Sequence, residues 1–139
     1  MKALGNRVAM LIGRGTVIVV DIQNSVRKGT EQPQEIAAYV ELTAFGEDQF
    51  TVIEWLQSRS SEKETFLVVG SLMGHLTVFS LEGMNKKIYR FINNAHFEGV
   101  TSLSECPLSE ERHILFASGS YDGSVAIWNL DQNAPIFKT

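Results

Sequence analysis

Two segments of this 139-residue chain are copies of one pattern. Residues 68–81 align without a gap on residues 117–130, at an offset of 49 residues. Glycine recurs at the centre of both copies, and apolar residues recur at alternate positions after it, which is the period of a β-strand with one buried face. Each copy is therefore predicted to be a strand, a glycine-containing turn and a second strand.

A weaker third copy covers residues 9–22, and its turn is about two residues shorter. Spacings of 49 and 59 residues are typical of propellers and solenoids, in which each repeat buries its faces against its neighbours. Runs rich in Val, Ile, Phe, Tyr and Thr predict further strands between the hairpins. These runs cover residues 36–45, 50–56, 87–92, 100–104 and 135–139. The chain is thus predicted to be all-β, with a sheet of three strands followed by two sheets of four.

Residues 94–130 resemble one complete WD repeat. The segment Asn94-Ala95-His96 stands where that family has a Gly-His pair, and FASGSYDGSVAIWNL matches its Ser-Gly-Ser-x-Asp-Gly turn and its strand ending in Trp-Asp. Ala95 replaces the glycine of that pair, and Asn129 replaces the final aspartate. The resemblance implies antiparallel four-stranded blades of a WD-repeat β-propeller, incomplete at about 2.75 blades.

The resemblance also implies how the chain divides: an incomplete blade at residues 1–45, a degenerate blade at 46–93 and a well-matched WD blade at 94–139. A closed propeller of this family needs about seven blades. We therefore expect either a fragment or isoform of a longer protein, or a chain whose ring is completed by other chains.

In the well-matched blade, the family pattern implies a buried hydrogen-bond network among His96, Ser118, Asp122 and Trp128. Such a network makes a blade rigid when every group is paired. It is structural, so these residues are not predicted to form an active site.

The middle repeat has Val69, Met73 and Phe79 where the third repeat has the serine, aspartate and tryptophan, and no histidine precedes it. An all-apolar replacement leaves no polar group unpaired, which is the inexpensive way to dispense with such a network.

The resemblance implies a non-catalytic scaffold or adaptor that binds protein or peptide partners. In the family, the residue before the turn aspartate tends to face the ligand, which makes Tyr121 and its counterpart Leu72 candidate partner-binding residues; the alternative is that both pack on neighbouring turns. A second hypothesis is a structural subunit or fragment that completes a propeller within a larger multiprotein assembly. A third, an enzyme built on a propeller, needs a cluster of titratable groups that the sequence does not offer.

Charge and cysteine content limit the class of partner and the compartment. The formal charge of −4 disfavours nucleic acid, and the single Cys106 favours a reducing compartment, the cytoplasm or the nucleus. The apolar run at residues 8–22 is interrupted and too short to cross a bilayer.

The three histidines lack the spacing of metal ligands, so no metal site is predicted. No cofactor and no catalytic residue are predicted either. Gly13 and Gly15 are interpreted as a tight turn rather than a nucleotide-binding loop. The polar segments 27–34 and 58–64 are interpreted as loops, with docking or phosphorylation segments as the alternative.

Overall fold

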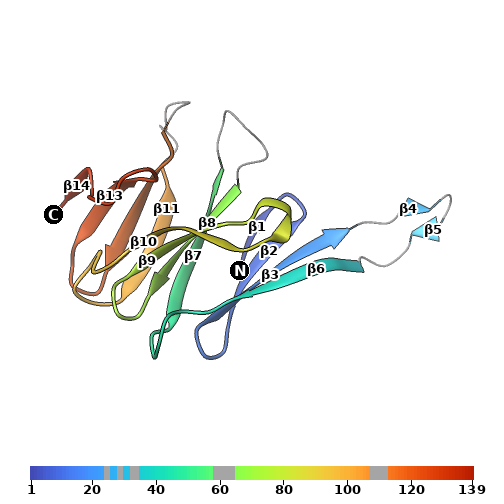
Figure 1. Ribbon diagram of the computed structural model, residues 1–139, viewed down its shortest axis with the longest axis horizontal. Helices are drawn as coiled ribbons and strands as arrows, with labels where there is room; N and C mark the ends of the chain where they lie inside the picture. Colours follow the sequence, from blue (N-terminus) through green and yellow to red (C-terminus); the bar gives the residue numbers. More distant parts are fainter. Residues whose placement is uncertain (24–25, 28–29, 32–34, 58–64, 107–112) are drawn as a thin grey trace.

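Three four-stranded antiparallel sheets stand side by side in the computed structural model (Figure 1). The structure describes the whole chain except residues 24–25, 28–29, 32–34, 58–64 and 107–112. Segment 58–64, and most of segment 27–34, therefore lie outside the described residues. The described residues contain no α-helix, only the short 3₁₀ turn η1 (Glu82–Met84). The all-β class predicted from the repeats is confirmed.

The first sheet has the order β1-β2-β3-β6. Its strands are β1 (Lys2–Leu4), β2 (Arg7–Ile12), β3 (Thr16–Gln23) and β6 (Glu35–Leu42), and a small hairpin of β4 (Val26–Arg27) and β5 (Thr30–Glu31) projects beyond it. The expectation of three strands here was wrong. β1 is a fourth strand that pairs with β2, with Leu4 opposite Arg7 and Lys2 opposite Ala9. A three-residue strand is too short to show an alternating pattern, so the repeats could not reveal it.

The second and third sheets have equivalent strand orders. The second contains β7 (Phe50–Gln57), β8 (Thr65–Ser71), β9 (Leu76–Ser80) and β10 (Lys87–Ile92). The third contains β11 (Val100–Glu105), β12 (Leu115–Ser120), β13 (Val125–Asn129) and β14 (Phe137–Lys138). In each sheet the strands follow one another in chain order, as in a meander.

The strand register reproduces the sequence repeat. Gly70 lies opposite Leu76 in the second sheet, and Gly119 lies opposite Val125 in the third, so the two hairpins correspond residue for residue at the offset of 49. In the first sheet Ile12 lies opposite Thr16, which leaves a turn two residues shorter than in the other hairpins, as the alignment predicts.

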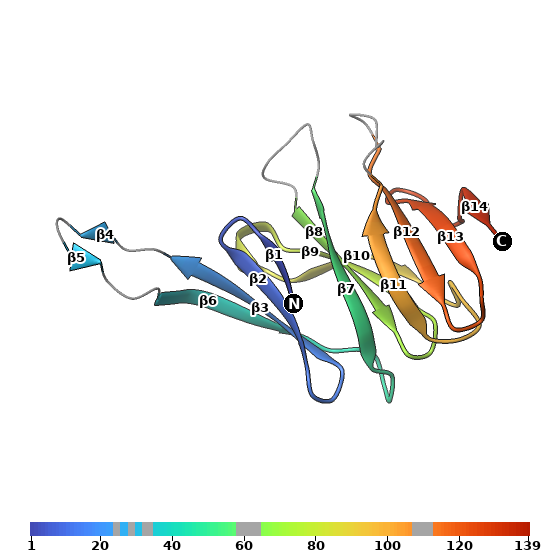
Figure 2. The same cartoon turned by 180° about the vertical axis from the view of Figure 1, so that it is seen from behind.

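Two apolar cores lie between successive sheets. The core between the first and second sheets includes Val19, Trp55 and Leu67, and the core between the second and third includes Phe116 and Trp128. The first strands of the sheets, β1, β7 and β11, are neighbours in turn (Figure 2). Each sheet therefore buries a face that it could not bury alone, and the turns between strands meet at the ends of the sheets.

Candidate functional site

His96 is almost completely buried, with 1% of its surface exposed, in the segment that leads into β11. Its backbone N–H donates to the carbonyl oxygen of Gly74 in the β8–β9 turn at 3.0 Å. This bond fixes the histidine against the turn of the neighbouring sheet and directs its ring into the third sheet.

A continuous chain of hydrogen bonds passes through the His96 ring. The indole Nε1 of Trp128 donates to Ser118 Oγ at 2.8 Å, and Ser118 Oγ lies 2.7 Å from His96 Nε2. On the other side of the ring, His96 Nδ1 lies 2.7 Å from Ser124 Oγ, which donates to Asp122 Oδ1. The four predicted residues are brought together, with Ser124 as a fifth.

Counting donors fixes the direction of every bond in this chain. The single hydroxyl proton of Ser124 is used on Asp122, so the Nδ1–H of His96 must donate to Ser124 Oγ. The Nε2 of a neutral imidazole is then an acceptor, and Ser118 donates to it while accepting from Trp128. Only the neutral ring with its proton on Nδ1 satisfies all groups.

Burial lowers the pKa of His96, and the charge of Lys138 acts in the same direction, whereas the Asp122 carboxylate opposes them. The pKa of Asp122 lies well below its ordinary range, chiefly because the Ser124 hydroxyl donates to it; the backbone N–H groups of Ser124 and Phe97 add to the effect. A neutral histidine and an ionised aspartate are the states that this geometry favours.

Ser124 is the network residue that the sequence analysis missed. His96 Nδ1 lies 3.8 Å from Asp122 Oδ2, too far for a direct hydrogen bond, so the serine bridges them. The signal was present as a serine two positions after the aspartate in the Asp-Gly-Ser turn, where Ser124 N–H also donates to Asp122 at 2.7 Å. Serine and aspartate in such turns commonly bond to nearby backbone.

Of the three apolar residues that replace the network in the middle repeat, the two on strands are buried and the one in the turn is exposed. Val69 and Phe79 are buried with exposed fractions of 0% and 5%, whereas Met73 is 58% exposed. The position of the aspartate is therefore occupied by a surface side chain.

The two candidate partner-binding residues lie on neighbouring turns. Leu72 is 53% exposed and Tyr121 is 75% exposed. Both border Gly99: a Cβ placed there would lie 3.1 Å from the Leu72 carbonyl oxygen and 3.5 Å from Tyr121 Cδ2. We call Leu72, Gly99 and Tyr121 the turn surface.

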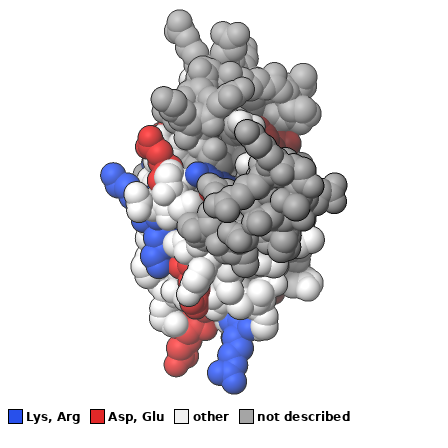
Figure 3. All heavy atoms as spheres, turned by 90° about the vertical axis from the view of Figure 1, so that its right-hand side faces the viewer, with Lys and Arg blue, Asp and Glu red and all other residues white. Residues whose placement is uncertain are grey.

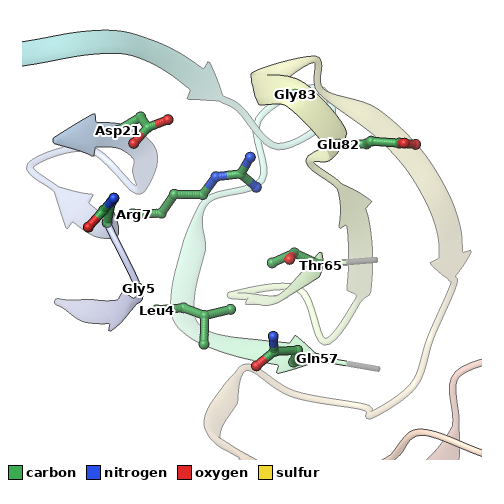
Figure 4. Close-up of a pocket in the computed structure, with 9 residues that line it drawn as sticks. Leu4, Gly5, Arg7, Asp21, Gln57, Thr65, Glu82 and Gly83 are labelled. Carbon is green, nitrogen blue, oxygen red and sulfur yellow. The ribbon is translucent and has the colours of Figure 1, made fainter. Parts of the chain in front are cut away.

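A pocket of about 600 Å³ opens between the first and second sheets, beside the turn from β1 to β2 (Figure 4). Arg7 extends from β2 into this pocket, and its Nη1 donates to the carbonyl oxygen of Leu81 at 2.7 Å. Asp21 and Glu82 also line the pocket. Because the guanidinium already binds the backbone directly after β9, this arrangement joins the first sheet to the end of the second.

No group of three or more His, Cys, Asp or Glu side chains in the described part of the chain is arranged to hold a metal ion. Burial and the charge of Glu105 raise the pKa of the Cys106 thiol, which disfavours a reactive thiolate.

The face drawn in Figure 3 carries described Lys and Arg side chains beside Asp and Glu side chains. Among the described residues there is also no helix long and apolar enough to span a membrane.

Comparison with known proteins finds similarity in structure alone. No family model and no curated protein sequence matches the chain. Saccharomyces cerevisiae Sqt1 superimposes with a TM-score of 0.66 at 14% identity over 97% of this chain. A chain of the Chaetomium thermophilum polycomb repressive complex 2 gives a TM-score of 0.60 at 21% identity over 84%. A structure of an active polycomb repressive complex 2 in the basal state also gives 0.60, at 20% identity over 84%.

The chain spans only 22% to 33% of these solved chains. Its three sheets nevertheless have the same strand order as one another and pack face to face. The second and third sheets also have the same hairpin register. Together with the solved structures, this arrangement gives the chain the fold of three consecutive blades of a WD-repeat β-propeller.

Proposed function

We propose that this chain is a non-catalytic scaffold or adaptor of the cytoplasm or nucleus that binds protein or peptide partners through its turn surface. The observation that carries this proposal is the pair of large, exposed side chains, Leu72 and Tyr121, on either side of Gly99. Aromatic side chains dominate the binding energy of protein interfaces, and exposed apolar side chains brought together mark such interfaces.

The backbone beneath the turn surface is held in place. Tyr121 N–H donates to the Gly99 carbonyl oxygen at 3.0 Å, and Leu72 N–H donates to the Gln49 carbonyl oxygen at 2.8 Å. The buried network at His96 adds rigidity to the same end of the third sheet. A surface fixed before binding loses little conformational entropy when a partner binds, and this favours recognition of a peptide or protein surface.

The test uses peptides selected from a random library on the purified chain, with affinities measured by calorimetry. Tyr121→Ala and Leu72→Ala are each expected to weaken binding about tenfold or more, the range of an interface hot spot. The matched control is Tyr39→Ala, since Tyr39 is 69% exposed on the first sheet. Unchanged affinity in both turn variants, with folding intact by circular dichroism, would show that the turn surface is not the binding site.

A second function, a structural part that completes a propeller within a larger assembly, is favoured by the outer faces of the end sheets. Tyr39 on the first sheet and Val125 and Phe137 on the third are 69%, 46% and 51% exposed. Ile127 and Phe137 are paired on the face opposite Ala126 and Trp128, which pack in the core. In a repeat protein such faces are covered by the next repeat.

Light scattering on the purified chain separates the two functions. A folded, cooperative monomer that binds peptides supports the scaffold. A chain that folds only with further blades or another chain supports the structural role.

A further inference from the structure

A second pocket, of about 410 Å³, lies where the segment between β6 and β7 meets the second sheet. Its volume is in the range of small-ligand sites. We call it the Phe45 pocket. The residues that matter for its chemistry are Phe45, Glu47, Asp48, His75, Thr77 and Phe91.

Aromatic rings form one side of the Phe45 pocket. The rings of Phe45 and Phe91 meet edge to face with centroids 5.4 Å apart, and the His75 ring lies 5.5 Å from Phe91. The His75 ring is held in place because its Nδ1 accepts the backbone N–H of Asn94 at 3.0 Å. Phe45 is 59% exposed and Phe91 is 39% exposed, so both rings present surface to a ligand.

Two other exposed rings of the chain, those of Tyr89 and Phe97, already have a cation over them, whereas the rings of Phe45 and Phe91 do not. Lys138 Nζ lies 5.4 Å from the centre of the Phe97 ring, and Arg90 lies 5.9 Å from the centre of the Tyr89 ring. Among the described residues, no Lys or Arg lies over Phe45 or Phe91. The negative face of an aromatic ring attracts a cation, so this pair offers an attraction that the chain itself does not use.

Two carboxylates give the Phe45 pocket negative charge. Glu47 and Asp48 both line it, and neither forms an ion pair with a described residue. Asp48 is fixed because its Oδ1 accepts the backbone N–H groups of Gln49 at 2.8 Å and Met73 at 3.0 Å. The charge therefore has a defined position beside the rings.

A buried hydroxyl supplies the fourth feature. Thr77 lines the Phe45 pocket and is 4% exposed, and its hydroxyl forms no hydrogen bond with any described residue. A buried polar group without a partner is unfavourable, and a ligand N–H group can relieve it.

From these four features we propose that the Phe45 pocket binds the cationic side chain, lysine or arginine, of a protein partner. The aromatic rings hold the aliphatic part and attract the charge, Glu47 and Asp48 neutralise it, and Thr77 accepts a hydrogen bond from it. This proposal does not depend on the turn surface, because none of the four features involves Leu72 or Tyr121.

The experiment is a titration of the ¹⁵N-labelled chain followed by NMR. The probes are Nα-acetyl-lysine amide, Nα-acetyl-arginine amide and the uncharged analogue Nα-acetyl-norleucine amide. We expect the two cations to shift the amide signals of Phe45, Glu47 and Thr77, and to bind several times more tightly than norleucine. Equal binding of norleucine, or shifts spread over acidic residues elsewhere, would overturn the proposal.

Variants assign the binding to the pocket. Phe45→Leu keeps an apolar side chain but removes the ring, and Glu47→Gln keeps the shape but removes the charge. Each is expected to weaken binding of the cations roughly two- to fivefold. Phe97→Leu and Glu98→Gln are the matched controls and should leave it unchanged, because both residues are exposed and neither lines the pocket. If the controls weaken binding as much as the pocket variants, the assignment is wrong.

Discussion

The carboxylate of Asp48 accepts a hydrogen bond from the backbone N–H of Met73 at 3.0 Å. In the third sheet the equivalent bond runs the other way, from Phe97 N–H to Asp122 Oδ2 at 2.8 Å. At the offset of 49 residues, Asp48 corresponds to Phe97 and Met73 corresponds to Asp122. In both sheets a bond thus joins the segment before the first strand to the turn between the second and third strands. The aspartate lies in that segment in the second sheet and in the turn in the third.

This relationship predicts that Asp48 stabilises the second sheet although its turn has no aspartate. Asp48→Ala removes the acceptor of two backbone N–H groups, so we expect a loss of about 1 kcal/mol in the free energy of unfolding. Urea unfolding measures it. Glu47→Ala is the control, and a change within about 0.5 kcal/mol is expected there. Equal unfolding midpoints for the Asp48 variant and the parent chain would contradict the prediction.

The sequence predicted the fold well where the repeat was strong. The β-hairpins at residues 68–81 and 117–130 have the predicted register, because a strand with one buried face alternates and a one-residue slip would expose the apolar residues. β1 was missed because Lys2–Leu4 is too short to alternate and is held by pairing with β2 and by Trp55, whose Nε1 donates to the Lys2 carbonyl oxygen at 3.0 Å. Contacts of that kind depend on residues about 50 positions away.

The candidate site was predicted in part for a similar reason. His96, Ser118, Asp122 and Trp128 have a family pattern, and the structure brings them together. Ser124 stands in the Asp-Gly-Ser turn of the sequence, but its bridging role follows from the 3.8 Å between the histidine and the aspartate, which only the structure shows. The Phe45 pocket likewise joins residues from three segments with no common pattern.

Ser118 is predicted to be the most sensitive position of the network. Ser118→Ala leaves the Trp128 indole N–H and His96 Nε2 without partners inside a core, and each orphaned group costs about 1 to 3 kcal/mol. Trp128→Phe removes one of these groups, so the double variant should lose less stability than the sum of the single variants. Chemical unfolding of the four chains gives the coupling. Strict additivity would show that the bonds do not act together.

Acid is predicted to destabilise the third sheet in two stages. The pKa of His96 in the folded chain lies below its ordinary value of 6.5, chiefly because the ring is buried. The unfolded chain therefore binds more protons, and the stability that His96 contributes is complete above pH 6.5 and is lost as the pH falls below that value. Protonation also gives Nε2 a hydrogen that faces the hydroxyl of Ser118.

Asp122 adds the second stage. Its folded pKa is depressed, so its contribution is present above its ordinary value of 3.8 and is lost as the pH falls further. The measurement is the thermal midpoint between pH 7.5 and pH 3 for the parent chain and for His96→Gln. His75 and His113 are present in both chains, so a shallower decline in the variant between about pH 6.5 and pH 4 isolates His96. Parallel declines would contradict this assignment.

Two glycines at equivalent turns are predicted to respond differently to the same substitution. Gly74 and Gly123 have φ values of +85° and +83°, so alanine at either position costs about 1 to 2 kcal/mol of backbone strain. At Gly123 a Cβ would meet nothing within 4 Å, whereas at Gly74 it would collide with the backbone carbonyl of His96 and lie 2.8 Å from that of Glu98. Gly74→Ala must therefore also displace the segment that positions His96, and we expect it to lose clearly more stability than Gly123→Ala in urea. It should also shift the Trp128 indole N–H signal in NMR spectra, because His96 shares Ser118 with that indole. An equal loss in the two variants, with the indole signal unmoved, would mean that the β8–β9 turn does not support the network.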